Sequence, residues 1–111
     1  MQDARPAIAI VGAGSIGVAF AIVFARTHHA VRLFDPDAAA RERALSTFAA
    51  RLDDLVEAGL QDRASIAEVL PRLTVCAELA DAVGTADLVI ECAPERVEIK
   101  RDLFAQLDAL T

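Results

Sequence analysis

Aromatic residues are scarce in this sequence, because tryptophan and tyrosine are absent and phenylalanine supplies the 5% that is aromatic. Basic residues are also few: 11 Lys and Arg stand against 17 Asp and Glu, for a formal net charge of −6. Proteins that bind nucleic acid need clustered Lys and Arg for the phosphates, and many use aromatic rings on which bases stack. We therefore expect no nucleic-acid partner.

Cysteines and long apolar runs are also rare. The two cysteines, Cys76 and Cys92, are too few for a metal site, and both would stay reduced in the cytoplasm, where we expect the protein. No apolar run reaches the roughly 18 residues of a membrane span, so we expect no membrane partner. The N-terminal residues 1–6 lack a charged segment followed by a cleavable apolar one, and we expect no signal peptide.

The remaining composition is that of a folded domain. The 111 residues are 55% hydrophobic and 25% charged, and the apolar ones are mostly Ala, Val, Ile and Leu. Short apolar runs alternate with helical patterns along the chain. We expect strands over residues 7–11, 30–34, 72–76 and 87–91, and helices over about 16–27, 38–57, 65–70, 79–83 and 96–110.

Two of the predicted helices have recognisable apolar positions. In the first, residues at helical spacing are the apolar Ile16, Phe20, Val23 and Phe24, followed by Thr27, and in the second the apolar positions are Leu45, Phe48, Leu52, Leu55 and Val56. Gly59 suits the end of the second helix, and Pro71 the end of the third. Strands separated by helices pair in parallel through right-handed crossovers. The sequence therefore predicts an α/β fold.

A glycine-rich loop follows the first predicted strand directly. In the run GAGSIG, Gly12 permits a tight turn, Gly14 lets a phosphate approach the backbone, and Gly17 lets the helix pack on the strand. The helix that starts there offers free N–H groups to an anion. We therefore expect Gly12, Gly14, Ser15, Ile16 and Gly17 to bind the pyrophosphate of a dinucleotide.

An acidic residue completes this pattern. Asp35 ends the second predicted strand, 18 residues after Gly17, where a carboxylate can bind the adenosine ribose hydroxyls. It would repel a 2′-phosphate, and no Arg follows it directly, which favours NAD over NADP as the cofactor. The alternative to a dinucleotide site is purely structural: the glycine loop would form a tight turn and the aspartate would cap a helix, with no ligand bound. The loop and the acid occur together, which favours the dinucleotide.

These features predict a Rossmann-type parallel sheet with helices on both faces, truncated after strand 4 and its helix. Residues 1–111 would form the N-terminal part of an NAD-binding domain, with a catalytic C-terminal domain absent. A full dinucleotide fold has six strands in the order 3-2-1-4-5-6, so we expect the edge of strand 4 to be open.

The loop, Asp35 and the run DLVIECAPERVEIKRDLFAQL over residues 87–107 resemble the 3-hydroxyacyl-CoA dehydrogenase family. The resemblance runs from Ile8 to Leu110 and also includes the long helix after strand 2. It implies an NAD-dependent oxidoreductase that oxidises a secondary 3-hydroxyl to a ketone, in fatty acid metabolism. It further implies a small-molecule or acyl-CoA substrate and a homodimer in the intact enzyme.

The resemblance places Ala93, Glu95 and Lys100 beside the nicotinamide end of the cofactor. The residues alone favour another interpretation, in which Glu95 caps the last helix and Lys100 is a solvated surface residue; the resemblance is what favours the cofactor role. The catalytic His of the family and its acidic partner follow a fifth strand. We therefore assign no catalytic residue in this chain, and we expect the 111 residues alone to be inactive. His28 and His29 belong to a surface turn.

Two departures bear on the substrate. Ile16 stands where many members have Met, and residues 51–58 carry one base and three acids, a poor surface for CoA phosphates. Together with Pro94 and the run FAQL over residues 104–107, these features resemble the λ-crystallin and L-gulonate 3-dehydrogenase branch, with L-gulonate or another small 3-hydroxy acid as an alternative substrate. The chain could instead be a stand-alone dinucleotide-binding module or a structural, crystallin-like protein without catalysis.

Overall fold

The computed structural model describes residues 5–92. Its centre is a parallel sheet of four strands in the order β3-β2-β1-β4. The strands are β1 (Ile8–Val11), β2 (Val31–Phe34), β3 (Leu73–Cys76) and β4 (Leu88–Glu91). In register, Ile8 lies opposite both Val31 and Leu88. The strand order is that of one half of a doubly wound sheet extended by a fourth strand, as the sequence predicts.

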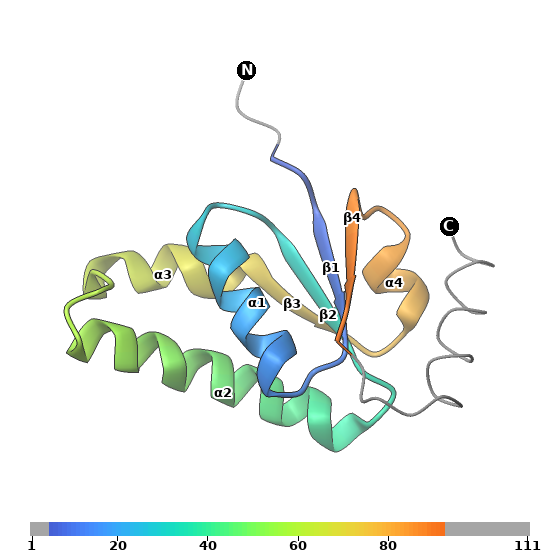
Figure 1. The fold of residues 1–111 in the computed structure, drawn as a ribbon, viewed down its shortest axis with the longest axis horizontal. Coiled ribbons are helices and arrows are strands. Elements are labelled where there is room, and N and C mark those ends of the chain that lie inside the picture. The colour runs from blue at the N-terminus through green and yellow to red at the C-terminus, as the bar shows by residue number, and fades with distance from the viewer. Residues whose placement is uncertain (1–4, 93–111) are drawn as a thin grey trace.

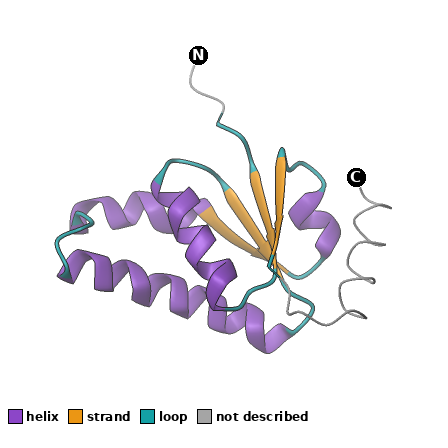
Figure 2. Cartoon of the chain, in the orientation of Figure 1, coloured by secondary structure: helices purple, strands orange, loops and turns teal. Residues whose placement is uncertain are grey.

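Helices cover both faces of the sheet (Figures 1 and 2). On one face lie α1 (Ser15–Arg26) and α2 (Ala38–Glu57), and on the other lies α4 (Leu79–Val83). A segment of short helices, η1 (Arg63–Ser65), α3 (Ile66–Val69) and η2 (Leu70–Arg72), leads from α2 into β3. None of the helices among the described residues is long and apolar enough to cross a membrane.

The predicted α/β fold is confirmed, and most of the predicted elements lie within a residue or two of their expected bounds. The third helix, α3, ends at Val69, close to its predicted end before Pro71. Pro71 itself lies inside the 3-10 turn η2, at whose start a proline is tolerated. The predicted helix over 96–110 lies outside the described residues.

The first helix packs differently from its apolar pattern. Its buried residues are the small ones and their neighbours: Gly17, Val18, Ala21, Ile22 and Ala25. The large side chains of Ile16, Phe20 and Val23 are 67%, 40% and 55% exposed. The close approach that Gly17 and the alanines allow brings the helix backbone near the sheet, which turns the larger side chains outward.

The second helix follows its predicted pattern more closely. Phe48 and Leu52 are completely buried in the core cluster that α2 shares with α1 and the sheet, and Leu55 is half-buried, whereas Leu45 is 52% exposed. Ala44 takes the place expected for Leu45 in the core. The helix ends at Glu57 with Ala58 as its C-cap, and Gly59 follows. The φ of 77° at Gly59 and the hydrogen bond from its amide to the Val56 carbonyl (3.0 Å) complete a glycine C-terminal motif.

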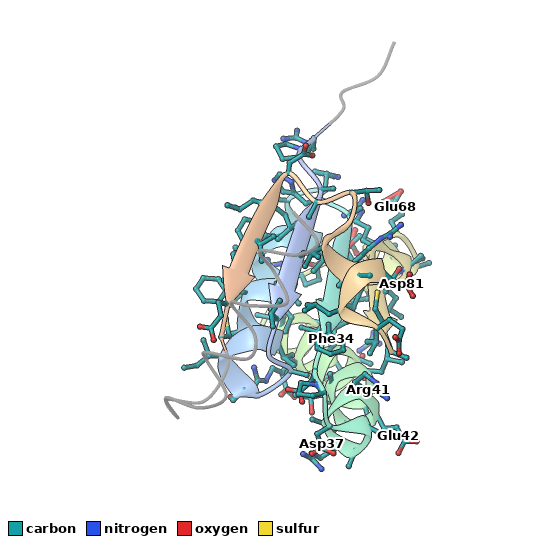
Figure 3. All side chains as sticks on the ribbon, turned by 90° about the vertical axis from the view of Figure 1, so that its right-hand side faces the viewer. Phe34, Asp37, Arg41, Glu42, Glu68 and Asp81 are labelled. Atoms are coloured by element: carbon teal, nitrogen blue, oxygen red, sulfur yellow. The ribbon has the colours of Figure 1, made fainter. Side chains whose placement is uncertain are left out.

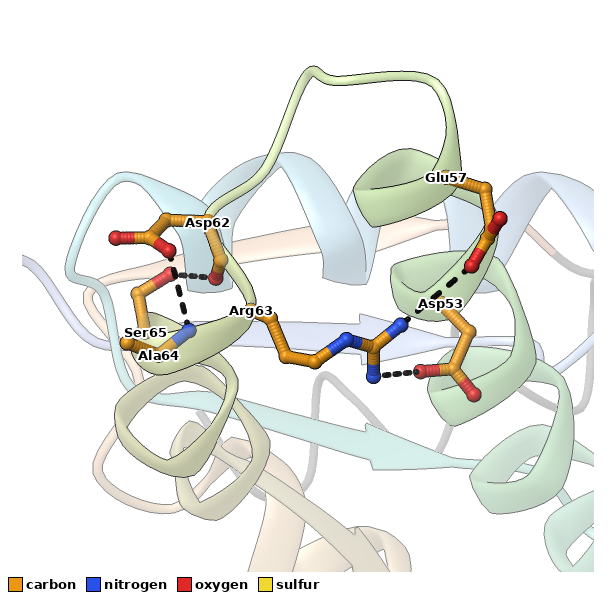
Figure 4. A network of polar contacts seen from close by, with 6 residues as sticks. All are labelled: Asp53, Glu57, Asp62, Arg63, Ala64 and Ser65. Atoms are coloured by element: carbon orange, nitrogen blue, oxygen red, sulfur yellow. Dashed lines mark hydrogen bonds and ion pairs between the residues drawn. The ribbon is translucent and has the colours of Figure 1, made fainter.

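Polar contacts fix the segment that follows α2 (Figure 4). Asp62 accepts a hydrogen bond from the Ala64 amide (3.2 Å) at the start of η1, and the Ser65 hydroxyl donates to the Asp62 carbonyl (2.7 Å). The Arg63 guanidinium lies 3.6 Å from the Asp53 carboxylate and 3.7 Å from that of Glu57. These ion pairs are exposed, and each contributes little to stability.

At the other end of the described sheet, β4 lies at the edge, next to β1 only. Leu88 is 47% exposed there, and Val89 and Ile90 are half-buried. The open edge of strand 4 is thus observed for the described residues.

Candidate functional site

The glycine loop joins β1 to α1 at the carboxyl end of the sheet. Gly12 has a φ of 116°, a left-handed conformation that favours glycine, and its amide donates to the Phe34 carbonyl (2.7 Å). A Cβ on Gly17 would lie 1.9 Å from the Gly12 carbonyl oxygen. The loop therefore needs glycine at both positions, for the turn and for the close contact of α1 with it.

Gly14 differs from these two glycines. Its φ of −76° and ψ of −170° are open to any residue, and a Cβ there would meet nothing within 4 Å. No backbone strain and no close protein neighbour requires a glycine at this position. The space in front of Gly14 is therefore open to a ligand that approaches the backbone closely.

The N-terminus of α1 faces the same place. Gly14 is its N-cap without a side-chain cap, and the first hydrogen bond of the helix runs from the Val18 amide to the Gly14 carbonyl (3.0 Å). The preceding amides, of Ser15, Ile16 and Gly17, have no partner within the helix. The first turn contains no acidic residue. Unpaired amides and the positive end of the helix dipole favour a phosphate there.

The Asp35 carboxylate lies beside the glycine loop and bonds to its backbone. One carboxylate oxygen accepts from the Ala13 amide (2.9 Å) and the other from the Asp37 amide (2.9 Å). Its carboxylate thus ties the glycine loop to the turn after β2, a second role that the sequence pattern alone does not show. Each oxygen still has a lone pair for a ribose hydroxyl.

Two neighbours shape the turn after β2 (Figure 3). Asp37, not Asp35, caps α2, because its carboxylate accepts a hydrogen bond from the Ala39 amide (3.1 Å). Figure 3 labels Asp37 and Arg41 near the start of this helix. The Arg41 guanidinium reaches back to the Asp35 carbonyl (2.7 Å). The cap and this bond hold the Asp35 backbone at the carboxyl end of the sheet.

Sequence reasoning missed a contact between α2 and the loop. The Arg51 guanidinium donates to both the carbonyl (3.0 Å) and the hydroxyl (2.7 Å) of Ser15. Thirty-six residues separate the two, so no local pattern could have indicated it. Arg51 also lines a shallow hollow of about 460 Å³ between α1 and the second half of α2, together with the apolar Ile22 and Leu55 and the acidic Asp54.

The remaining candidate residues lie at the end of β4 or beyond it. The Cys92 amide donates to the Val11 carbonyl (2.7 Å), which brings the end of β4 beside the start of the glycine loop. Partial burial, and then the nearby Glu91, raise the pKa of the Cys92 thiol, so it remains protonated near neutral pH. Ala93, Glu95 and Lys100 lie outside the described residues.

The two histidines lie at the opposite end of the sheet, before β2. His28 follows the end of α1 in a turn, as the sequence predicts, and its φ of 73° is left-handed. The His29 ring stacks edge-on against Phe24 and shares a hydrogen bond with the Pro6 carbonyl (2.8 Å). These contacts are structural, and neither ring can reach the glycine loop.

Known proteins share this arrangement. Residues 7–111 match the model of the family described as 3-hydroxyacyl-CoA dehydrogenase, NAD binding domain. The chain is 43% identical over 112 residues to an L-carnitine dehydrogenase of Streptomyces griseus, covering 99% of the chain and 31% of that protein. It is 34% identical over 110 residues to the human λ-crystallin homolog, covering 98% of the chain and 34% of that protein.

Solved structures agree with these sequence relatives. The fold is similar to that of an Escherichia coli 3-hydroxybutyryl-CoA dehydrogenase, with a TM-score of 0.84 and 38% sequence identity. That likeness covers 95% of this chain and 22% of the other. The chain thus spans about a third of the two curated relatives and about a fifth of the solved enzyme.

Proposed function

The chain belongs to the 3-hydroxyacyl-CoA dehydrogenase family, whose NAD-binding domain it matches, and from this we propose that it serves as the cofactor-binding part of an NAD-dependent oxidoreductase. The intact protein would oxidise a secondary 3-hydroxyl to a ketone. Residues 1–111 would be the N-terminal part of the NAD-binding domain, and the catalytic residues would lie outside this chain.

One observation carries the cofactor proposal: Gly14 has nothing within 4 Å of its missing Cβ, whereas a Cβ on Gly17 would collide with the loop at 1.9 Å. The fold by itself requires glycine at positions 12 and 17, because of the positive φ at Gly12 and the close contact at Gly17. It does not explain a glycine at an open position with an unstrained backbone. A pyrophosphate that lies against the backbone at position 14 would explain the glycine, because any side chain there would occupy the space of the phosphates.

We propose specific contacts on this basis. The amides of the α1 N-terminus, in the loop of Gly12, Gly14, Ser15, Ile16 and Gly17, would hold the pyrophosphate, and Asp35 would accept the hydroxyls of the adenosine ribose. Ala93, Glu95 and Lys100 would lie at the nicotinamide end. NAD bound in this way supplies a nicotinamide ring that can accept a hydride from the carbon that bears the hydroxyl.

The carboxylate of Asp35 also supports the choice of NAD over NADP. A 2′-phosphate would lie against an ionised carboxylate, and like charges at hydrogen-bond distance repel strongly. Arg41, the nearest cation after β2, already donates to the Asp35 carbonyl and does not offset that carboxylate.

The family suggests a general substrate class, and one contact in the structure favours a narrower one. As a family member, the protein would act on a 3-hydroxyacyl-CoA or a related 3-hydroxy acid, in fatty acid metabolism or a neighbouring route. One observation favours a small hydroxy acid such as L-gulonate: Arg51, the one base in residues 51–58, is already bonded to Ser15. The acidic residues beside it, Asp53, Asp54 and Glu57, make a poor surface for CoA phosphates.

We also propose that the intact enzyme is a cytoplasmic homodimer. The cytoplasmic setting is supported by Cys76 and Cys92, which are both free thiols, and Cys76 is buried. The alternative functions, a stand-alone dinucleotide-binding module and a crystallin-like structural protein, would share the glycine loop but not the turnover.

Turnover in the intact protein tests this function. NADH formation, followed by its absorbance, is measured with 3-hydroxybutyryl-CoA and, separately, with L-gulonate. NADH from either substrate supports the dehydrogenase, and the larger kcat/KM identifies the substrate class. Binding of NAD with no turnover on any 3-hydroxy compound would favour the module or the structural protein instead.

A further inference from the structure

Arg51 reaches from α2 to the first residue of α1. It donates through one nitrogen to the Ser15 carbonyl (3.0 Å) and through the other to the Ser15 hydroxyl (2.7 Å). A guanidinium holds its donors in a rigid fork, so two bonds to one residue fix both the backbone and the side-chain rotamer of Ser15. Arg51 is itself half-buried between α1 and α2.

The direction of these bonds determines what the Ser15 hydroxyl can do. A serine hydroxyl has one hydrogen to donate and two lone pairs that accept. Because a guanidinium only donates, Arg51 occupies a lone pair and leaves the hydroxyl hydrogen for another acceptor. The positive charge at this distance also strengthens the hydroxyl as a donor.

The position of Ser15 indicates the acceptor. Ser15 is exposed and begins α1 next to the open space at Gly14. A pyrophosphate offers acceptors only, and it would reach the same place as the unpaired amides of the first turn. A hydroxyl that already accepts from Arg51 and keeps its hydrogen free to donate is therefore complementary to a phosphate oxygen.

We propose that Arg51 is a positioning residue for the dinucleotide: it holds Ser15 so that the serine hydroxyl donates to the pyrophosphate. This inference rests on the proposed NAD-binding function and deepens it. Arg51 acts through Ser15, so its contribution is confined to ligands that carry the phosphates.

Calorimetry with two ligands tests this inference in the intact protein. ADP-ribose contains the pyrophosphate, and adenosine lacks it. A hydrogen bond to a charged group is worth enough that Ser15→Ala is expected to weaken ADP-ribose binding about tenfold. Arg51→Met is expected to weaken it about fivefold. Both variants should bind adenosine as the unaltered protein does, because no phosphate is involved.

Three further variants separate positioning from other effects. The double variant Ser15→Ala/Arg51→Met should bind ADP-ribose no more weakly than Ser15→Ala alone, because the effect of Arg51 passes through the hydroxyl. Arg51→Lys, which keeps a donor and the charge, should recover part of the affinity. Arg63→Met removes the same charge from exposed ion pairs with Asp53 and Glu57 and should change nothing.

The proposal is overturned if Arg51→Met leaves ADP-ribose binding unchanged, or if Arg51→Lys is no better than Arg51→Met. It is also overturned if the loss persists in the Ser15→Ala background, since Arg51 would then act directly. An equal loss for adenosine would show a purely structural role. Failure of the unaltered protein to bind NAD or ADP-ribose would refute the proposed function itself.

Discussion

Two glycines of the loop, Gly17 and Gly14, are expected to respond differently to the same added methyl group. In Gly17→Ala the new Cβ would lie 1.9 Å from the Gly12 carbonyl oxygen and 3.0 Å from its carbon. A normal carbon–oxygen contact is more than 1 Å longer, so α1 must move away from the loop. That movement would loosen the contacts of Val18 and Ala21, which are 1% and 0% exposed.

Overpacking of this kind destabilises proteins by about 1–3 kcal/mol, and backbone rather than a flexible side chain must yield here. We therefore expect Gly17→Ala to lower the free energy of unfolding by about 3 kcal/mol. Urea denaturation, followed by circular dichroism, measures the loss. NAD binding should weaken as well, because the displaced helix carries the amides that face the phosphates.

Gly14→Ala is the matched control. Its methyl group enters open space at an unstrained backbone position. The loss of a glycine N-cap and the stiffer unfolded chain act in opposite directions, so stability should change by less than about 1 kcal/mol. Equal unfolding free energies for Gly17→Ala and the unaltered protein would refute this account of the loop.

Further predictions concern Asp35, Cys76 and the edge of the sheet. Asp35→Asn should lower the preference for NAD over NADP, measured as the ratio of the two dissociation constants; an unchanged ratio would argue against the ribose contact. Burial is the main cause that raises the pKa of the Cys76 thiol, so folding favours its protonated form. The free energy of unfolding should therefore fall as the pH rises above about 8.5, and fall less in Cys76→Ala. Identical pH profiles for the two proteins would contradict that link. The 111-residue chain should self-associate through β4 in sedimentation experiments, and Leu88→Lys should reduce this; a chain that stays monomeric at high concentration would count against it.

Much of the fold can be predicted because its signals are local. Apolar strands followed by helical periodicity indicate the order of elements, and parallel pairing follows from the crossovers. The pattern over residues 38–57 predicts a long helix with the bounds that the structure has. The roles of Gly12 and Gly17 follow from their spacing, and the structure confirms the turn and the close packing.

Packing across elements cannot be predicted in the same way. The pattern of large apolar residues in α1 indicates a core face through Ile16, Phe20 and Val23, yet the helix buries the neighbouring face, which contains its small residues together with Val18 and Ile22. The approach distance of the helix decides this, and it depends on Gly17 meeting the loop in three dimensions. The distance between α1 and the sheet cannot be inferred from the spacing of residues along the sequence.

The site is only partly predictable for a similar reason. The place of Asp35 after β2 indicates its importance, but its bond to the Ala13 amide depends on how the loop folds back. The Arg51–Ser15 contact joins two elements across 36 positions and depends on the path of α2 along α1. Ala93, Glu95 and Lys100 stay predictions, since they lie outside the described residues.

A calorimetric titration of NAD into the intact protein and into its Gly14→Val variant tests the central claim most directly. Valine is compatible with the extended backbone at Gly14, and its Cβ would meet nothing within 4 Å, so the variant should fold and lose no more than the ~1 kcal/mol of the glycine N-cap. We expect NAD to bind the unaltered protein and to bind the variant at least tenfold more weakly, about 1.4 kcal/mol or more. Equal NAD affinity in both proteins would contradict a pyrophosphate at the Gly14 backbone.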